Sequence, residues 1–234
     1  GDISIINVDT NEEIPITQTG YFDQNPHWSA DGNAIIFSSE RFGMRNHASW
    51  GSEMDVMMTF LNKDAYDKFR LNEEDFDLLK EVEKQQKKAS QKSDDDKDKK
   101  KGKKGKKDDK ADEQKSDKDL VIDREGLQER TVRITPNSSE LSDYALSKDG
   151  ETLYYLSAFE GGYDLWKNDL RKQEASIVKK LDAGGTAIEK DDDGNFFLIG
   201  SSVKKFEPGS SKVTPVKISA KVKIDPDFGK KKTM

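Results

Sequence analysis

The pair Asp-Gly occurs three times in this chain, at spacings that indicate an internal repeat. Asp31-Gly32, Asp149-Gly150 and Asp193-Gly194 each precede a run of β-branched or aromatic residues, as a tight turn between two strands does. The second and third pairs are 44 residues apart, whereas the first and second are 118 apart. An insertion of 74 residues, the difference between the two spacings, would restore a constant period.

A period near 44 residues, built from strands and hairpin turns, is typical of one four-stranded propeller blade. The chain is long enough for only a few such blades. We therefore predict an all-β fold: a partial β-propeller of four-stranded blades with a helical and disordered insertion. The expected parts are propeller blades in 1–61, a helical insertion in 62–88, a disordered tether in 89–119, propeller blades in 120–224, and a tail or linker start in 225–234.

Alternating apolar and polar residues between turn clusters place the expected strands. One blade contributes only its last two strands, at 3–8 and 13–17. The next three blades have strands at 25–29, 34–39, 55–61 and 131–135; at 143–147, 152–158, 163–169 and 175–181; and at 186–189, 196–201, 203–206 and 213–218. Asp55-Val56 and Asp164-Leu165 align as equivalent strand starts, which assigns the insertion to the second of these blades.

The first part of the insertion is expected to form a helical hairpin on the propeller edge. Asn72 followed by Glu73-Glu74-Asp75 is typical of a helix start, because an amide caps the first turn and carboxylates favour the positive end of the helix dipole. Apolar side chains follow at helical spacing: Phe76, Leu79 and Val82, with Tyr66 and Phe69 on a shorter helix before them. The hairpin is either a stabilised insertion, which is the simpler interpretation, or a lid or docking surface.

The second part of the insertion is expected to be a disordered tether. From Gln91 to Asp119 the only aliphatic side chain is Ala111, and 12 Lys stand against 10 Asp and Glu. This stretch cannot bury enough apolar surface to offset the entropy of ordering. The lysine run 99–107 alone is typical of a nucleic-acid or anionic-surface patch, but acidic residues flank it and no aromatic is interleaved to stack on a base. A solvated tether of mixed charge is the better interpretation.

Charge and composition exclude several kinds of partner. The formal net charge is -6, so the folded part has no electrostatic reason to bind nucleic acid or anionic lipid. The absence of cysteine excludes disulfides and thiolate chemistry. No window has the apolar length of a membrane span, and the N-terminus lacks the regions of a signal peptide. Because the chain starts with Gly1-Asp2-Ile3, which already looks like part of a strand, we expect the chain to be a piece of a longer protein.

The sequence carries no recognisable catalytic motif. A Ser/His/acid triad would have to use His27 or His47, the only two histidines. His27 lies in an expected strand beside Trp28, where a structural histidine is typical, and His47 lies in a loop near Ser49. No Gly-x-Ser-x-Gly elbow or phosphate-binding loop is present. We therefore expect no catalytic residue in this chain.

Neither a metal site nor a cofactor is expected. Glu189, Asp191 and Asp193 imitate the start of a calcium loop, but Gly200 stands where such a loop needs a bidentate glutamate. A hairpin turn is the better interpretation of this stretch, and weak cation binding is the alternative.

Several stretches resemble the propellers of known families. Pro26-His27-Trp28-Ser29-Ala30-Asp31-Gly32, followed by Ile35 to Arg41, resembles the repeated motif of the TolB and tricorn families. Four further stretches look like the late blades of tricorn-like serine peptidases of the bacterial type: Leu120 to Asp123, Gly126 to Thr135, Leu153 to Leu156, and Gly162 to Trp166. The resemblance covers nearly the whole chain except the charged tether.

This resemblance implies a non-catalytic propeller that guides or gates peptide or unfolded-protein substrates towards PDZ and protease domains of the same polypeptide. It also implies a periplasmic or secreted protein, with the cytoplasm as the other compartment. No segment matches the family's serine nucleophile motif, and the tail Phe228 to Met234 departs from the family's helical linker. The alternatives are a stand-alone TolB-like propeller that binds folded partners, which the downstream gene context would distinguish, and a hydrolase that uses His47.

The long loop after the strand 34–39 holds the candidate substrate-binding residues. Arg41, Arg45, His47 and Trp50 combine cations and an aromatic in a loop on a rigid scaffold. Such loops, together with unpaired strand edges, hold extended peptides through backbone hydrogen bonds. The alternative is that these residues only cover a blade edge. An open set of blades also exposes sheet faces and edges, which predicts a homo-oligomer or marginal stability in isolation.

Overall fold

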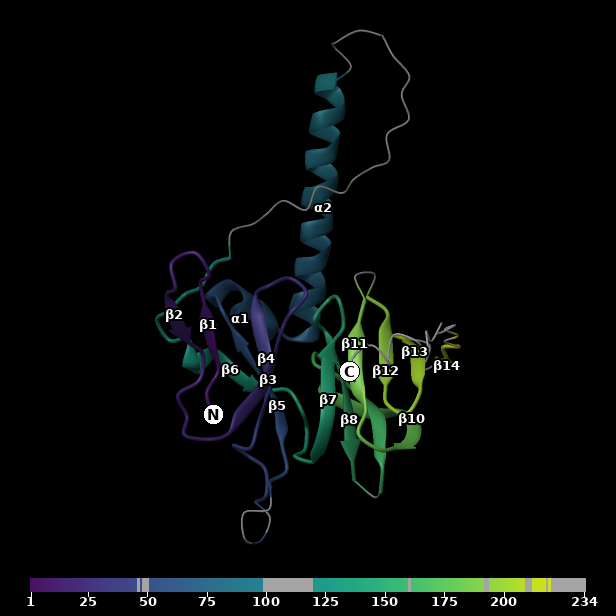
Figure 1. Ribbon diagram of the computed structural model, residues 1–234. Helices are drawn as coiled ribbons and strands as arrows, with labels where there is room; N and C mark the ends of the chain where they lie inside the picture. The colour runs from purple at the N-terminus through teal and green to yellow at the C-terminus, as the bar shows by residue number, and fades with distance from the viewer. Residues whose placement is uncertain are drawn as a thin grey trace, which may run out of the picture.

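A computed structural model describes residues 1–45, 47, 51–98, 120–159, 161–191, 194–208, 212–217 and 219 (Figure 1). For residues 87–98 the description covers the backbone alone. Trp50, Asp193, and residues 99–119 of the expected tether lie outside the described residues.

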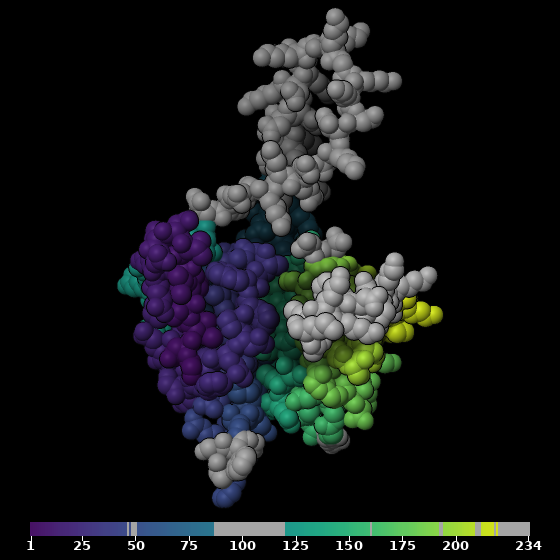
Figure 2. Space-filling model, in the orientation of Figure 1, coloured from purple at the N-terminus to yellow at the C-terminus, as the bar shows by residue number. Residues whose placement is uncertain are grey.

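The described chain forms one two-stranded and three four-stranded antiparallel sheets, arranged side by side (Figure 1 and Figure 2). The two-stranded sheet pairs β1 (Ser4–Ile6) with β2 (Glu13–Pro15). The four-stranded sheets have the orders β3 (Asp23–Trp28), β4 (Ala34–Ser39), β5 (Asp55–Phe60), β6 (Thr131–Arg133); β7 (Glu140–Leu146), β8 (Thr152–Ala158), β9 (Tyr163–Asp169), β10 (Glu174–Ala183); and β11 (Ala187–Lys190), β12 (Phe196–Ile199), β13 (Val203–Glu207), β14 (Lys212–Pro215). Each four-stranded sheet is one expected blade, so the predicted fold class is confirmed.

The turn between the first two strands of a blade is closed by the same side-chain contacts in the first two four-stranded sheets. Ser29 Oγ donates to Asp31 Oδ1 at 2.6 Å, and Ser147 Oγ donates to Asp149 Oδ1 at 2.5 Å. Burial raises the pKa of Asp31, but hydrogen bonds from Ser29 and Asn33 outweigh this effect and hold the pKa below its usual value. The Asp-Gly repeat therefore encodes a specific turn with a bound carboxylate.

The third blade closes its turn with a different carboxylate. Asp191 Oδ1 accepts the N–H of Asn195 at 2.7 Å, and its Oδ2 accepts the Asn195 amide at 2.8 Å. The glycine of all three turns has a positive φ: Gly32 (+72°), Gly150 (+74°) and Gly194 (+84°). Glycine is the residue that adopts this conformation without strain, which explains its place in the repeat.

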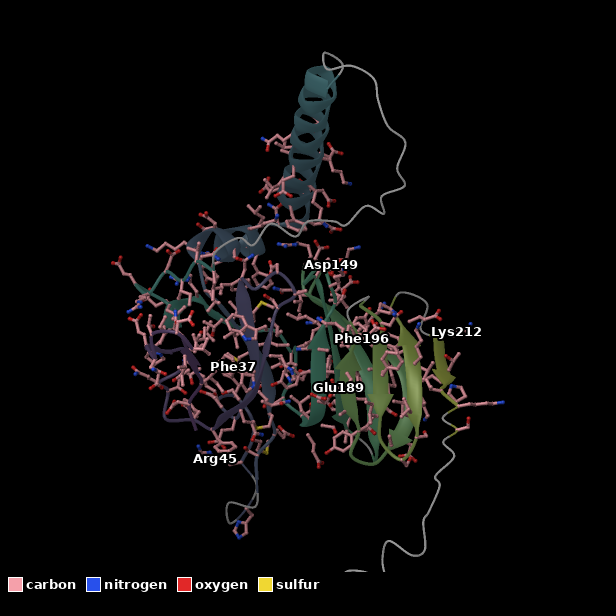
Figure 3. The ribbon with its side chains drawn as sticks, turned by 45° about the horizontal axis from the view of Figure 1, so that its top comes forward. Phe37, Arg45, Asp149, Glu189, Phe196 and Lys212 are labelled. Atoms are coloured by element: carbon pink, nitrogen blue, oxygen red, sulfur yellow. The ribbon has the colours of Figure 1, made fainter. Side chains whose placement is uncertain are left out.

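Each neighbouring pair of sheets buries an apolar cluster between them. Ile35 faces the two-stranded sheet, whereas the adjacent Ile36 faces the β7–β10 sheet, because successive residues of a strand point to opposite faces. Every residue of β4 is buried, as expected for a blade covered on both sides. The two clusters around Phe37 and Phe196, labelled in Figure 3, lie at opposite ends of this row of sheets.

The insertion after β5 begins with the expected helical hairpin. α1 (Lys63–Arg70) is capped by Asn62, whose side chain accepts the Ala65 N–H at 2.8 Å, and α2 (Glu73–Asp98) starts after Asn72. α2 extends away from the sheets (Figure 1) and continues past the expected boundary at residue 88, because lysine, glutamine and alanine favour a helix there. Neither of these two described helices is long and apolar enough to cross a membrane.

Arg171, in the turn between β9 and β10, fixes the helical insertion onto the neighbouring blade. Its Nη1 donates to the carbonyl oxygens of Phe69 and Leu71, both at 2.6 Å. Its guanidinium carbon lies 3.8 Å from the centroid of the Phe76 ring. The last carbonyls of a helix lack intrahelical donors, so Arg171 caps α1 from another blade.

We expect Arg171→Gln to loosen the insertion while leaving the sheets folded. The change removes two charge-assisted hydrogen bonds and a cation–π contact, about 2 kcal/mol together. Limited proteolysis should therefore cut within α1 and α2 faster than in the parent chain. The matched control is Lys172→Gln, because the ammonium of Lys172 lies 3.5 Å from Glu73 in an exposed pair that contributes little. Equal cleavage rates for the two variants would show that Arg171 is not the anchor.

Candidate functional site

Between β4 and β5, the described residues 40–45, 47 and 51–54 form the two arms of a ribbon that projects from the side opposite the helical insertion (Figure 1). Arg45 and Ser52 form an antiparallel bridge, and the N–H of Glu53 donates to Met44 O at 3.0 Å. A Cβ added at Gly43 would lie 1.7 Å from Glu53 O. The two arms are therefore in direct backbone contact, and any side chain at position 43 would force them apart.

The base of the ribbon is bonded to the next blade. The N–H of Met54 donates to Ser139 O at 2.8 Å, and the N–H of Ser139 donates back to Met54 O at 3.1 Å. Ser139 precedes β7, and its hydroxyl accepts a hydrogen bond from Ser157 Oγ of β8 at 2.6 Å. The ribbon is thus held at its base by the rigid sheets on both sides.

The Glu40 carboxylate accepts hydrogen bonds from two side chains of the ribbon and from one backbone N–H outside it. Its Oε1 accepts the Arg45 guanidinium at 3.0 Å and the Phe22 N–H at 3.3 Å, and its Oε2 accepts the Ser52 hydroxyl at 3.0 Å. The Arg45 side chain is 66% exposed, and the Glu40 side chain is 20% exposed. The carboxylate is therefore occupied by internal donors, while much of the cation faces solvent (Figure 3).

Phe42 brings two arginines together beside the ribbon. The guanidinium carbon of Arg41 lies 5.3 Å from the Phe42 ring centroid, and that of Arg133 lies 5.4 Å from it. Arg41 belongs to the ribbon, whereas Arg133 belongs to β6, after the insertion. Phe42 is 50% exposed, so this cationic and aromatic cluster lies at the surface.

Asp55, at the start of β5, holds Arg133 in this position. Asp55 is fully buried, and its Oδ1 accepts Arg133 Nε at 2.8 Å and the Thr135 hydroxyl at 2.7 Å. Its Oδ2 accepts the Ser138 hydroxyl at 2.7 Å. These donors balance the negative charge of Asp55, and Asp55 holds the Arg133 guanidinium beside the Phe42 ring.

A cavity of about 340 Å³ lies between the two-stranded sheet and the next sheet, with Arg41 in its wall. Ile16, Phe37 and Met57 supply an apolar part of this wall. Asp23, which is 5% exposed, supplies a buried carboxylate. Glu129, which is exposed, adds a second carboxylate. The cavity therefore has an apolar surface, an exposed cation, a buried anion and an exposed anion.

The structure gives the expected site residues different surroundings. Arg41 contacts Phe42 and the cavity, Arg45 pairs with Glu40, and His47 is exposed on the ribbon. Trp50 lies outside the described residues. Sequence reasoning missed Phe42 and Arg133. The only signal was that Phe42 lies directly after the candidate Arg41. Arg133 is 91 positions further along the chain than Phe42, so no local pattern indicated it.

His27 lies beside an aspartate and a tyrosine of the neighbouring blade. Its Nε2 lies 4.0 Å from Asp143 Oδ1, and its ring meets the Tyr144 ring edge-on at a centroid distance of 5.5 Å. Asp143 also accepts the N–H groups of Tyr144 and Ile188, so it bonds neighbouring strands rather than serving the histidine alone. Within the described parts of the chain, no group of three or more His, Cys, Asp or Glu side chains could hold a metal ion.

Comparisons with solved structures show a β-propeller fold. TolB from Acinetobacter baumannii is 10% identical to this chain and matches 92% of it with a TM-score of 0.50. The tricorn protease is 11% identical and matches 92% of the chain with a TM-score of 0.54. The chain spans 37% of the length of that TolB and 19% of that of the tricorn protease. No protein-family model and no curated protein sequence matches the chain.

Proposed function

We propose that this chain is a non-catalytic propeller part of a tricorn-like serine peptidase. In this proposal it holds extended peptide substrates at the ribbon between β4 and β5 and guides them towards a separate protease domain. The observation that carries the proposal is the ribbon itself, which projects exposed cations and an aromatic ring from a base bonded to two blades. A rigid base lowers the conformational entropy that a peptide-binding loop loses on binding.

We expect Arg41→Gln combined with Arg45→Gln to weaken peptide binding about tenfold, because two exposed cationic contacts are lost. The full chain would be immobilised, and binding of an unstructured peptide library would be measured by biolayer interferometry. The matched control, Lys179→Gln with Lys180→Gln on β10, removes the same charge from another exposed surface. Thermal unfolding of each variant by circular dichroism would verify that the sheets remain folded.

Two outcomes would contradict this proposal in different ways. If the ribbon variant and the β10 control bind peptides equally well, the ribbon is not the binding site. If the chain binds folded proteins but no unstructured peptide, a TolB-like role in protein–protein interaction is the better account, and the fold likeness to TolB supports that role equally.

A further inference from the structure

We infer that the surface formed by Arg41, Phe42 and Arg133 selects peptides that carry an acidic residue beside a large apolar residue. This inference rests on the proposed peptide-binding function and specifies its substrate class. It also assigns a role to Phe42 and Arg133, which lie next to the expected site residues.

The first observation concerns the charges close to the ribbon. The two carboxylates that bind the neighbouring arginines are occupied: Asp55 is fully buried beneath three donors, and Glu40 accepts from Arg45, Ser52 and a backbone N–H. Glu53 of the ribbon and Glu129 of the cavity wall are further carboxylates nearby, and neither of these described residues forms an ion pair with Arg41. The guanidinium of Arg41 has no hydrogen-bond or ion-pair partner in the described part of the chain. An exposed guanidinium without an internal carboxylate is ready to bind one from a ligand.

The second observation is that two arginines lie beside one ring. Their guanidinium carbons are 5.3 Å and 5.4 Å from the Phe42 centroid. Arg133 Nε donates to Asp55, and its Nη2 pairs with Asp55 and donates to Ser138. Its Nη1 has no partner among the described residues. Two cations that both retain free N–H groups therefore lie next to the same ring, which suits a carboxylate.

The third observation is the cavity beside Arg41. It explains why the peptide should carry a large apolar residue next to its acidic residue. Ile16, Phe37 and Met57 offer an apolar wall within a volume of about 340 Å³, enough for one large side chain. Asp23, buried in the same wall, and Glu129, exposed in it, repel a carboxylate from the interior. The acidic group of a peptide is thus directed to Arg41 at the surface, while the apolar side chain enters the cavity.

The test compares two peptides that differ in one group. Both are ten residues long, acetylated and amidated, with a single Glu-Phe or Gln-Phe pair in a Gly/Ser background. We expect isothermal titration calorimetry of the full chain to give about tenfold tighter binding of the Glu-Phe peptide, an advantage that falls as salt rises. Arg41→Gln should abolish this preference, and Phe42→Leu should reduce it several-fold. Lys179→Gln, the matched control, should leave it unchanged.

Three results would overturn the inference. Equal binding of the two peptides would remove the selectivity and leave the proposed peptide-binding function standing. A preference that appears only when the C-terminus is free would assign the carboxylate to a chain end instead of an acidic side chain. Failure of both peptides to bind, if the unstructured library also fails to bind, would remove the proposed function together with the inference.

Discussion

Replacing Arg130 with Met should lower the free energy of unfolding by about 3 to 4 kcal/mol, as measured by urea denaturation. Arg130 is buried, and its guanidinium donates to the carbonyl oxygens of Phe60, Leu61, Glu125 and Asp123. The first two carbonyls lie where the chain enters the insertion, and the other two lie where it returns. Met preserves much of the side-chain volume but removes all four hydrogen bonds, and among these acceptors Leu61 O keeps the Asp123 N–H as a donor.

Two further variants test whether the loss of stability comes from the lost guanidinium geometry. One keeps the positive charge, and the other removes a nearby arginine that is exposed. Arg130→Lys should recover little stability, because a single ammonium cannot reach carbonyls on both sides of the insertion's base. Arg124→Met should change the free energy of unfolding by less than about 0.5 kcal/mol, because its pair with Glu12 is exposed on the surface. If Arg130→Met were as stable as Arg124→Met, the guanidinium would not be what closes the insertion.

The second large effect is expected for Asp55→Asn, which should cost about 3 kcal/mol of stability. Asn retains one acceptor oxygen but presents an amide donor to the donors that Asp55 binds from Arg133, Thr135 and Ser138. The guanidinium of Arg133 also loses its buried counter-charge. Because Arg133 adjoins Phe42, we expect the variant to weaken peptide binding at the ribbon as well as global stability.

The equivalent residue of the next blade is the matched control. Asp164 also stands at the start of a third strand, but among the described residues it accepts only the backbone N–H groups of Leu181 and Asp182, at 2.6 Å and 3.0 Å. Since these groups lie nearer the solvent and no ion pair is broken, Asp164→Asn should cost about 1 kcal/mol. A double-mutant cycle of Asp55→Asn with Arg133→Met should show strong coupling, and additive effects would contradict a shared network.

The repeat in the sequence predicted most of the fold because it rests on local chemistry. A Ser-x-Asp-Gly turn binds its own backbone within a few residues, so the turns after Ser29 and Ser147 are visible in the sequence without tertiary information. The alternation of the strands is local in the same way. The end of α2 is less well defined in the sequence, since residues with high helix propensity continue from the apolar part of the helix into the charged tract.

The candidate site was only partly predictable. The sequence indicated an exposed loop with cations, and Arg41 and Arg45 are at the surface of the ribbon. The sequence did not indicate that Glu40 would bind Arg45, or that Phe42 would adjoin Arg133. Phe42 precedes the insertion and Arg133 follows it, so no local sequence pattern encodes their contact.

The sequence by itself determined the blades, the turns and the place of the insertion, because each depends on residues a few positions apart. Only the tertiary structure decided how these parts are joined. Arg130 closes the insertion, Arg171 caps a helix of another blade, and Asp55 binds a side chain 78 positions away. Such contacts depend on how the sheets stack, because two charged groups attract strongly only after folding has brought them together and excluded water.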